Sequence, residues 1–166
     1  FNQGSPVQGK DFPGTIKKFH REGGRLYFDA DNSKLEVRVI SDEILRFRFN
    51  QDYFARDFSY AIDPAIVEKA IRAEVTENEI NYILETASVR VLINKNNLRI
   101  RIETLTGEVI CEDENGYHWE PNAGYGGNYV YCSKHIQTNE VFYGLGDKPC
   151  DLNLRGKDRK STRLNS

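Results

Sequence analysis

The stretch of residues 88–102, SVRVLINKNNLRIRI, decides the fold of this chain. Apolar and basic residues alternate in it, so that Val89, Val91 and Ile93 point to one side of an extended backbone and Arg90 to the other. The alternation resumes at Leu98, after a polar run with the composition of a turn. A period of two with one apolar side is typical of half-buried antiparallel strands. The stretch therefore predicts two such strands with their arginines in water.

The same alternation extends through most of the chain. It returns in residues 34–41, where Glu36 and Arg38 take the side opposite to the apolar residues, and again in residues 44–49. Asn115-Gly116 predicts a tight hairpin, because this dipeptide favours the positive φ angles of short β-turns. Short strands separated by such turns indicate an all-β fold, an antiparallel β-sandwich.

The outward side of the predicted strands carries both signs of charge. Oppositely charged neighbours on adjacent strands attract each other across the sheet. We therefore expect a wet face with paired charges rather than a basic stripe that binds an anionic ligand. The arginines are Arg46, Arg48, Arg90, Arg99 and Arg101, and the available glutamates are Glu36, Glu43, Glu85 and Glu103.

One segment supports two interpretations. Asp63-Pro64 has the form of a helix N-cap followed by proline in the first helical position, and the apolar residues after it fit one helix face. The alternative is a loop that leads into a strand over residues 71–75. We favour the loop and the strand, because the regions on both sides are β.

Composition limits the classes of function. The formal net charge is −2, so no global field favours nucleic acid or an anionic membrane, and no apolar run is long enough to span a bilayer. Cys111, Cys132 and Cys150 lack the spacing of a metal or redox site, and the histidines lack metal-ligand spacing, so no metal or cofactor is expected. The odd number of cysteines favours a reducing, cytoplasmic compartment.

The C-terminal motif carries a family resemblance. Residues 143–157, YGLGDKPCDLNLRGK, follow the segment 58–62, FSYAI, at a compatible spacing. Together with the predicted strands of residues 41–50 and 84–102, these motifs resemble the N-terminal β-sandwich of glycoside hydrolase family 31, the α-glucosidase and α-xylosidase family. The resemblance covers about residues 15–157 of the chain.

The resemblance implies a galactose-mutarotase-like supersandwich that precedes a catalytic (β/α)8 barrel. Members of the family are retaining α-glycosidases whose catalytic aspartates lie on the barrel, so it implies no catalytic residue and no cofactor in this chain. We expect a flexible segment over residues 1–14, the sandwich over 15–157 and a disordered or artefactual tail over 158–166. The chain is expected to be an inactive fragment whose partners are the missing barrel and an oligosaccharide substrate.

Two groups of residues are candidates for contacts. The aromatic-rich loop of residues 117–129 suits stacking on sugar rings, but we favour a hairpin whose aromatic residues cover the end of the sandwich, because its glycines are those that a long hairpin loop needs. The apolar run 141–143 predicts the end of a strand, and the charged residues after it are placed where the barrel docks, with a solvated turn as the alternative. The candidate sugar-binding residues are Trp119, Tyr125 and Tyr129, and the candidate barrel-interface residues are Asp147, Asp151 and Arg155.

Two other functions stay open. The first is a free-standing carbohydrate-binding module that holds sugar through the aromatic stretch. The second is a mutarotase-type epimerase, which needs histidines and a carboxylate in one cleft, and His118 and His135 beside one glutamate would meet that requirement. The histidines are isolated from one another in the sequence, so the sandwich domain of an α-glycosidase is the favoured interpretation.

Overall fold

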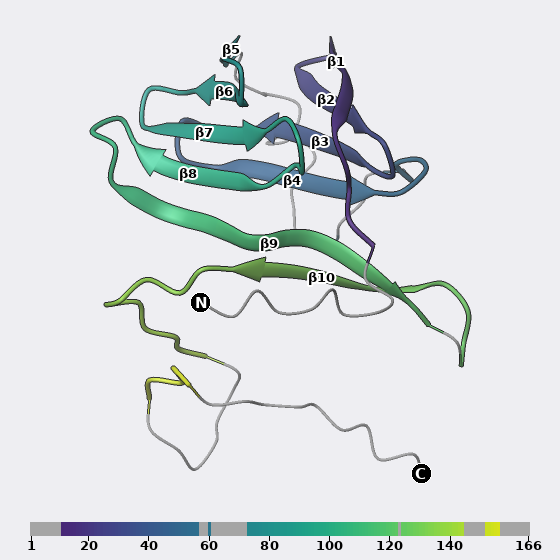
Figure 1. Ribbon diagram of the computed structural model, residues 1–166. Coiled ribbons are helices and arrows are strands. Elements are labelled where there is room, and N and C mark those ends of the chain that lie inside the picture. Colours follow the sequence, from purple (N-terminus) through teal and green to yellow (C-terminus); the bar gives the residue numbers. More distant parts are fainter. Residues whose placement is uncertain (1–10, 57–59, 61–72, 123, 145–151, 157–166) are drawn as a thin grey trace. The chain divides into compact units, whose positions relative to one another are not determined.

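A computed structural model describes residues 11–56, 60, 73–122, 124–144 and 152–156 of the chain. The chain divides into two units, Phe1–His135 and Ile136–Ser166, and each is described by itself. The strands β1 to β10 all lie in the first unit, as Figure 1 shows. Within the described ranges, no helix has the length and apolarity that a membrane span requires.

The first sheet contains four strands in the order β1-β2-β3-β4. Each strand pairs in antiparallel fashion with the next strand of the sequence, so the sheet is a meander with short turns. The alternation of residues 34–39 becomes the central strand β3, as predicted. The strands are β1 Ile16–Glu22, β2 Arg25–Ala30, β3 Lys34–Val39 and β4 Leu45–Asn50.

The second sheet contains six strands in the order β10-β9-β8-β7-β6-β5, again with antiparallel neighbours. The stretch 88–102 forms β7, a turn and the start of β8, so the predicted strand pair is confirmed. Leu98 belongs to the turn, where it has a φ of 57°. The strands are β5 Glu74–Glu77, β6 Asn81–Glu85, β7 Val89–Asn94, β8 Ile100–Thr104, β9 Val109–Pro121 and β10 Asn128–Lys134.

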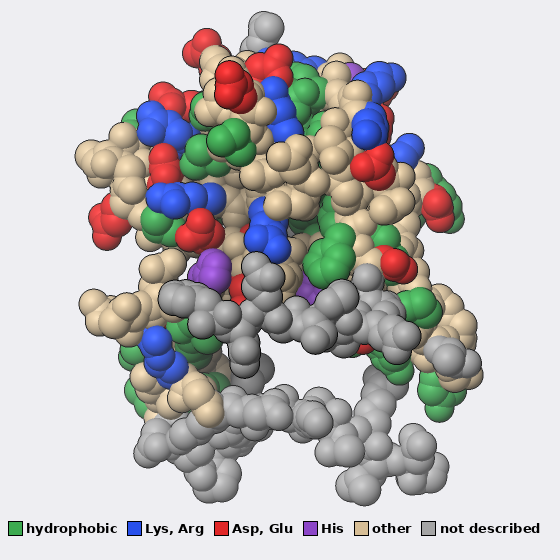
Figure 2. All heavy atoms as spheres, in the orientation of Figure 1, with side chains coloured by type: hydrophobic (Ala, Val, Ile, Leu, Met, Phe, Trp, Pro, Cys, Tyr) green, Lys and Arg blue, Asp and Glu red, His purple; other side chains and the backbone are tan. Residues whose placement is uncertain are grey.

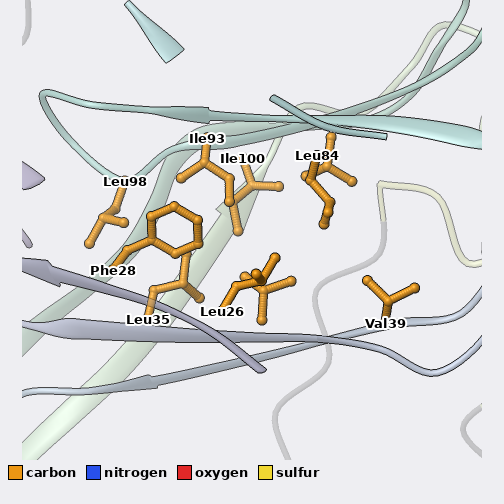
Figure 3. Packing of buried hydrophobic residues seen from close by; sticks show 10 residues of the cluster. Leu26, Phe28, Leu35, Val39, Leu84, Ile93, Leu98 and Ile100 are labelled. Carbon is orange, nitrogen blue, oxygen red and sulfur yellow. The ribbon is translucent and has the colours of Figure 1, made fainter. Parts of the chain in front are cut away.

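The two sheets enclose one apolar core, which confirms the antiparallel sandwich. Figure 3 shows Phe28 and Leu35 of the first sheet facing Ile93 and Ile100 of the second. Phe28, Leu35 and Ile93 are fully buried. Full burial of one such side chain stabilises the fold by about 1.5–3 kcal/mol. The cluster comprises Leu26, Phe28, Leu35, Val37, Val39, Leu84, Val91, Ile93, Leu98 and Ile100.

The prediction that β3 has one wet side is wrong. Glu36 and Arg38, on the side opposite to the core, are only 2% and 6% exposed. The chain after β4 lies over this side of the sheet, where Phe54 is 6.1 Å from Tyr27 between ring centroids. Alternation shows which residues share a face, but it cannot show that a later segment covers the polar one.

The prediction of a hairpin at Asn115-Gly116 is also wrong, because β9 runs without interruption through both residues. The pairing with β10 shifts between Ser133, which faces Gly116, and Lys134, which faces Asp113. The extra residues form a β-bulge, and Gly116 supplies the positive φ of 64°. The dipeptide predicted the local conformation correctly but not its place within a strand.

Several expectations concern residues near or beyond the described ranges. The ambiguous segment of residues 63–73 lies almost entirely outside them, whereas β5 overlaps the end of the predicted strand over residues 71–75. The strand expected to end at Tyr143 is absent from the described residues of the second unit. The predicted domain boundaries stay predictions, although Asp11, within the segment expected to be flexible, pairs with Trp119 through two backbone hydrogen bonds of 2.8 and 3.0 Å.

Candidate functional site

The outer face of the six-stranded sheet carries alternating charges from β6 to β9. We call this set the charge ladder, and it comprises Glu85, Arg90, Glu103, Arg101 and Glu112. Arg90 contacts Glu85 at 2.8 Å and Glu103 at 3.4 Å, and Arg101 contacts Glu103 at 3.2 Å and Glu112 at 3.6 Å. Figure 2 shows acidic and basic side chains next to each other over this part of the molecule. The expectation of paired charges on a wet face is therefore confirmed here.

The charge ladder adds little to the stability of the fold, but it determines the electrostatic character of this face. The side chains of Arg90 and Glu85 are 32% and 46% exposed, and partly exposed ion pairs of this kind contribute about 0–1 kcal/mol each. Because each arginine of the ladder contacts carboxylates, the face has no strong field of one sign. Such a surface suits neutral polar ligands better than anions or cations.

A pocket of about 410 Å³ opens on this face beside the charge ladder. Its floor comes from β7, where Leu92 points away from the core, and from β8, which contributes Arg101. Asn81 and Asn94 are cross-strand neighbours of β6 and β7 and both line the pocket. The remaining polar lining comes from the β7–β8 turn, from β8 and β9, and from the residue after β10: Asn97, Arg99, Glu103, Glu112, Asp113 and His135.

Asp113 fixes the edge of the pocket. Its side chain is 1% exposed, Oδ2 accepts a hydrogen bond of 2.8 Å from the backbone N–H of Ile100, and Oδ1 accepts one from Lys134. Burial lowers the pKa of Lys134, but the hydrogen bond and the charge of Asp113 outweigh it and raise that pKa above its ordinary value. The pair therefore ties β8, β9 and β10 together at the bulge.

The structure separates the three aromatic residues that the sequence placed in one candidate site. Trp119 lies in β9, is 5% exposed and packs on Tyr117 at 5.5 Å, so its ring belongs to the interior. Tyr125 is 93% exposed in the turn between β9 and β10, and Tyr129 is 52% exposed at the start of β10. The side-chain oxygen of Asn122 accepts hydrogen bonds from the N–H groups of residues 124 and 125 and shapes this turn.

The two histidines of the epimerase hypothesis lie in different environments. His118 is buried, its Nδ1 lies 3.0 Å from the carbonyl oxygen of Gly116, and its ring is stacked with Phe12 at 5.6 Å and Tyr131 at 5.2 Å. His135 is exposed and lines the pocket. A cleft formed by both histidines and a glutamate is therefore not what the described residues provide.

Arg155 forms hydrogen bonds with the backbone inside the second unit. Its Nη1 donates to the carbonyl oxygens of Gln137, Thr138 and Glu140 at 2.8, 2.8 and 2.7 Å. Asp147 and Asp151, the other candidates for a barrel interface, lie outside the described residues. The described part of the chain contains no cluster of His, Cys, Asp and Glu that could hold a metal ion.

The sequence analysis missed the pocket and its asparagines. From the sequence alone, the polar run of residues 94–97 predicts only a turn, and nothing distinguishes Asn81. The three asparagines share a location: Asn81 begins β6, Asn94 ends β7 and Asn97 lies in the turn that follows. The outward-facing Leu92 lines the same pocket. In this chain an outward-facing apolar residue flanked by amides borders the pocket, whereas alternation alone treats this side of the strand as an ordinary exposed face.

The fold and this surface together define a two-sheet antiparallel sandwich domain with an open polar face. The sequence profile described as "Glycosyl hydrolase 31 N-terminal galactose mutarotase-like domain" matches residues 34–165. The chain therefore belongs to this family, and the resemblance carried by the C-terminal motif is confirmed. No curated protein sequence matches the chain.

Solved structures share the fold. A family 31 dextranase from Flavobacterium johnsoniae, a mutant in complex with isomaltotriose, is 23% identical with a TM-score of 0.68, over 88% of this chain and 18% of that one. The cycloalternan-forming enzyme from Listeria monocytogenes, in complex with a pentasaccharide substrate, is 16% identical with a TM-score of 0.67, over 90% of this chain and 14% of that one. The chain thus spans less than one fifth of either protein, and identities this low show the fold alone.

Proposed function

We propose that this chain is the non-catalytic N-terminal sandwich of a retaining α-glycosidase, an α-glucosidase-like enzyme that hydrolyses terminal α-linked sugars. The observation that carries the proposal is the family match over residues 34–165. The two similar solved proteins are a dextranase and a cycloalternan-forming enzyme, each in complex with an oligosaccharide, and this supports a carbohydrate substrate.

The chemistry of the parent enzyme lies outside this chain in the proposal. Retaining glycosidases use two carboxyl groups about 5–5.5 Å apart, one as nucleophile and one as acid and base. The family resemblance assigns both to aspartates of the barrel. The sandwich then acts as a support that holds the barrel and the edge of its sugar site, without catalysis of its own.

The second unit supports a role in docking. Val141, Phe142 and Tyr143 are 47%, 39% and 61% exposed, and contiguous apolar surface of this kind is typical of an interface with another domain. Arg155 fixes the backbone just before these residues, and Asp147 and Asp151 follow them in the sequence. We therefore keep the segment around Asp147, Asp151 and Arg155 as the proposed contact with the barrel.

A hydrolysis assay tests the proposed function. The 166-residue chain and the same chain extended by the sequence that follows it in its gene would be incubated with a chromogenic α-glucoside. We expect no cleavage by the chain alone and cleavage by the extended protein. Cleavage by the chain alone, or an extended protein that lacks a barrel, would overturn the proposal.

The free-standing carbohydrate-binding module stays the second candidate, favoured by the exposure of Tyr125 and Tyr129. Its sugar-stacking residues would lie at the tip of the β9–β10 hairpin, because Trp119 is buried. An isolated chain that binds oligosaccharide through Tyr125, in a gene without a following barrel, would favour this module over the glycosidase domain.

A further inference from the structure

The pocket on the outer face of the six-stranded sheet has the size and the position of a binding site. Its volume of about 410 Å³ falls within the range of about 300–1,000 Å³ that is usual for small-molecule sites. It is built on strands β6, β7, β8 and β9 and on the turn between β7 and β8, so sheet hydrogen bonds hold the strands that line it. A site on such a scaffold needs little reorganisation to accept a ligand.

The charges around the pocket select a neutral ligand. Arg101 is held by Glu103 and Glu112, and Lys134 is held by Asp113. The lining itself carries three carboxylates, Glu103, Glu112 and Asp113, against two arginines, and Arg99 donates to the side-chain oxygen of Asn115 at 3.4 Å. A phosphate or sulfate would have to displace these contacts, whereas an uncharged molecule would not.

The hydrogen-bonding groups match a molecule rich in hydroxyls. The side-chain oxygens of Asn94 and Asn97 accept backbone N–H bonds of 2.9 and 3.0 Å from residues 96 and 99, so their amide N–H2 groups can donate to a ligand. Arg99 adds a fork of donors, and the glutamates of the ladder add acceptors. Leu92 adds an apolar side chain to the lining, and small-molecule sites usually combine apolar surface with a few polar groups.

We propose that this pocket binds a neutral glycosyl unit of an α-glucan. The choice of an α-glucan rests on the proposed function, whereas the preference for a neutral, polyhydroxylated ligand rests on the pocket itself.

An NMR titration of the 166-residue chain with isomaltotriose tests the proposal. We expect the backbone amide signals of Asn94, Asn97 and Arg99 to shift, with a dissociation constant of about 1 mM, as is usual for a small, solvent-exposed site. Inorganic phosphate at the same concentration is expected to leave these signals unchanged. Shifts caused by phosphate and not by isomaltotriose would identify an anion site and overturn the proposal.

Matched variants locate the ligand. Arg99→Ala and Asn81→Ala remove pocket donors, and Arg99 is an exposed residue whose loss leaves the core intact. We expect each to weaken isomaltotriose binding at least about fivefold, while Tyr125→Ala leaves it unchanged. Loss of binding in Tyr125→Ala alone would place the sugar on the hairpin tip, and a chain that binds no isomaltotriose would refute the proposed site. Neither result depends on hydrolysis by the extended protein, so the two proposals fail separately.

Discussion

Substitution of Gly116 by alanine tests the bulge that shapes β9 beside the pocket. Gly116 has a φ of 64°, and an added Cβ would lie 2.8 Å from Oδ2 of Asp113. Asp113 cannot move away freely, because the same oxygen accepts the 2.8 Å hydrogen bond from the buried N–H of Ile100. The substitution therefore forces either a steric clash or the loss of a buried hydrogen bond.

The expected loss of stability has two parts. A left-handed backbone costs a residue with a Cβ about 1–2 kcal/mol. A buried donor without its acceptor costs about 1–3 kcal/mol more. The free energy of unfolding of Gly116→Ala should therefore fall by about 2–5 kcal/mol, the sum of these two effects.

Gly126→Ala is the matched control. Gly126 has a φ of 73° in the β9–β10 turn, and its Cβ would meet no atom within 4 Å, so only the backbone cost of about 1–2 kcal/mol applies. Urea unfolding followed by the fluorescence of Trp119, the single and buried tryptophan, measures both variants. Equal losses in Gly116→Ala and Gly126→Ala would refute the role assigned to Asp113.

Three further predictions concern charged contacts. Glu36→Gln should lower the free energy of unfolding by about 2–4 kcal/mol, measured by urea unfolding, because the substitution removes the carboxylate that lies 3.3 Å from the partly buried Arg48. Glu85→Gln, at an exposed position, should lower it by less than about 1 kcal/mol. The pKa of Lys134 is raised in the folded chain, so its contribution to stability is present below pH 10.5 and is lost as the pH rises through the pKa of the folded state. Lys134→Met should therefore reduce the fall of the melting temperature with pH in this alkaline range. A melting temperature that falls equally steeply in both proteins would contradict the pairing with Asp113. Arg155→Ala should speed amide hydrogen exchange of residues 137–140 about tenfold, because the three carbonyl contacts of Nη1 are lost, and unchanged exchange would count against this role.

The strands of this sandwich were predictable where their period was regular. The alternating residues 89–93 lie in β7, Val89–Asn94, because apolar residues at every second position can face a core in only one register. The partners of Arg90 were predictable too, since Glu85 and Glu103 face it across neighbouring strands. The strand β7 and the partners of Arg90 depend on the spacing of residues within a strand and on pairing with strands that are adjacent in the sequence.

The errors arose where distant segments decide the environment. Glu36 is buried because the chain after β4 covers its side of the sheet, and Trp119 is buried because β9 extends through the region expected to be a loop. Asn115-Gly116 forms a bulge because β10 pairs on both sides of it. The pocket could not be predicted for the same reason, since its residues come from separate strands and meet only when the register is set.

The two sheets differ in what their outer faces can bind, and this difference determines where function can lie in the first unit. On the first sheet, Arg48 holds Glu36 and the carbonyl oxygen of Ala55, and it lies 5.2 Å from the ring of Phe54, so polar groups of this face already have partners within the chain. On the second sheet, the charges of the ladder are paired with one another, but the adjacent side-chain amides and Leu92 border an open pocket. Ligand binding needs both access and hydrogen-bonding capacity that the fold has not used. The six-stranded sheet meets both conditions, and a sugar bound there would leave the packing between the sheets undisturbed.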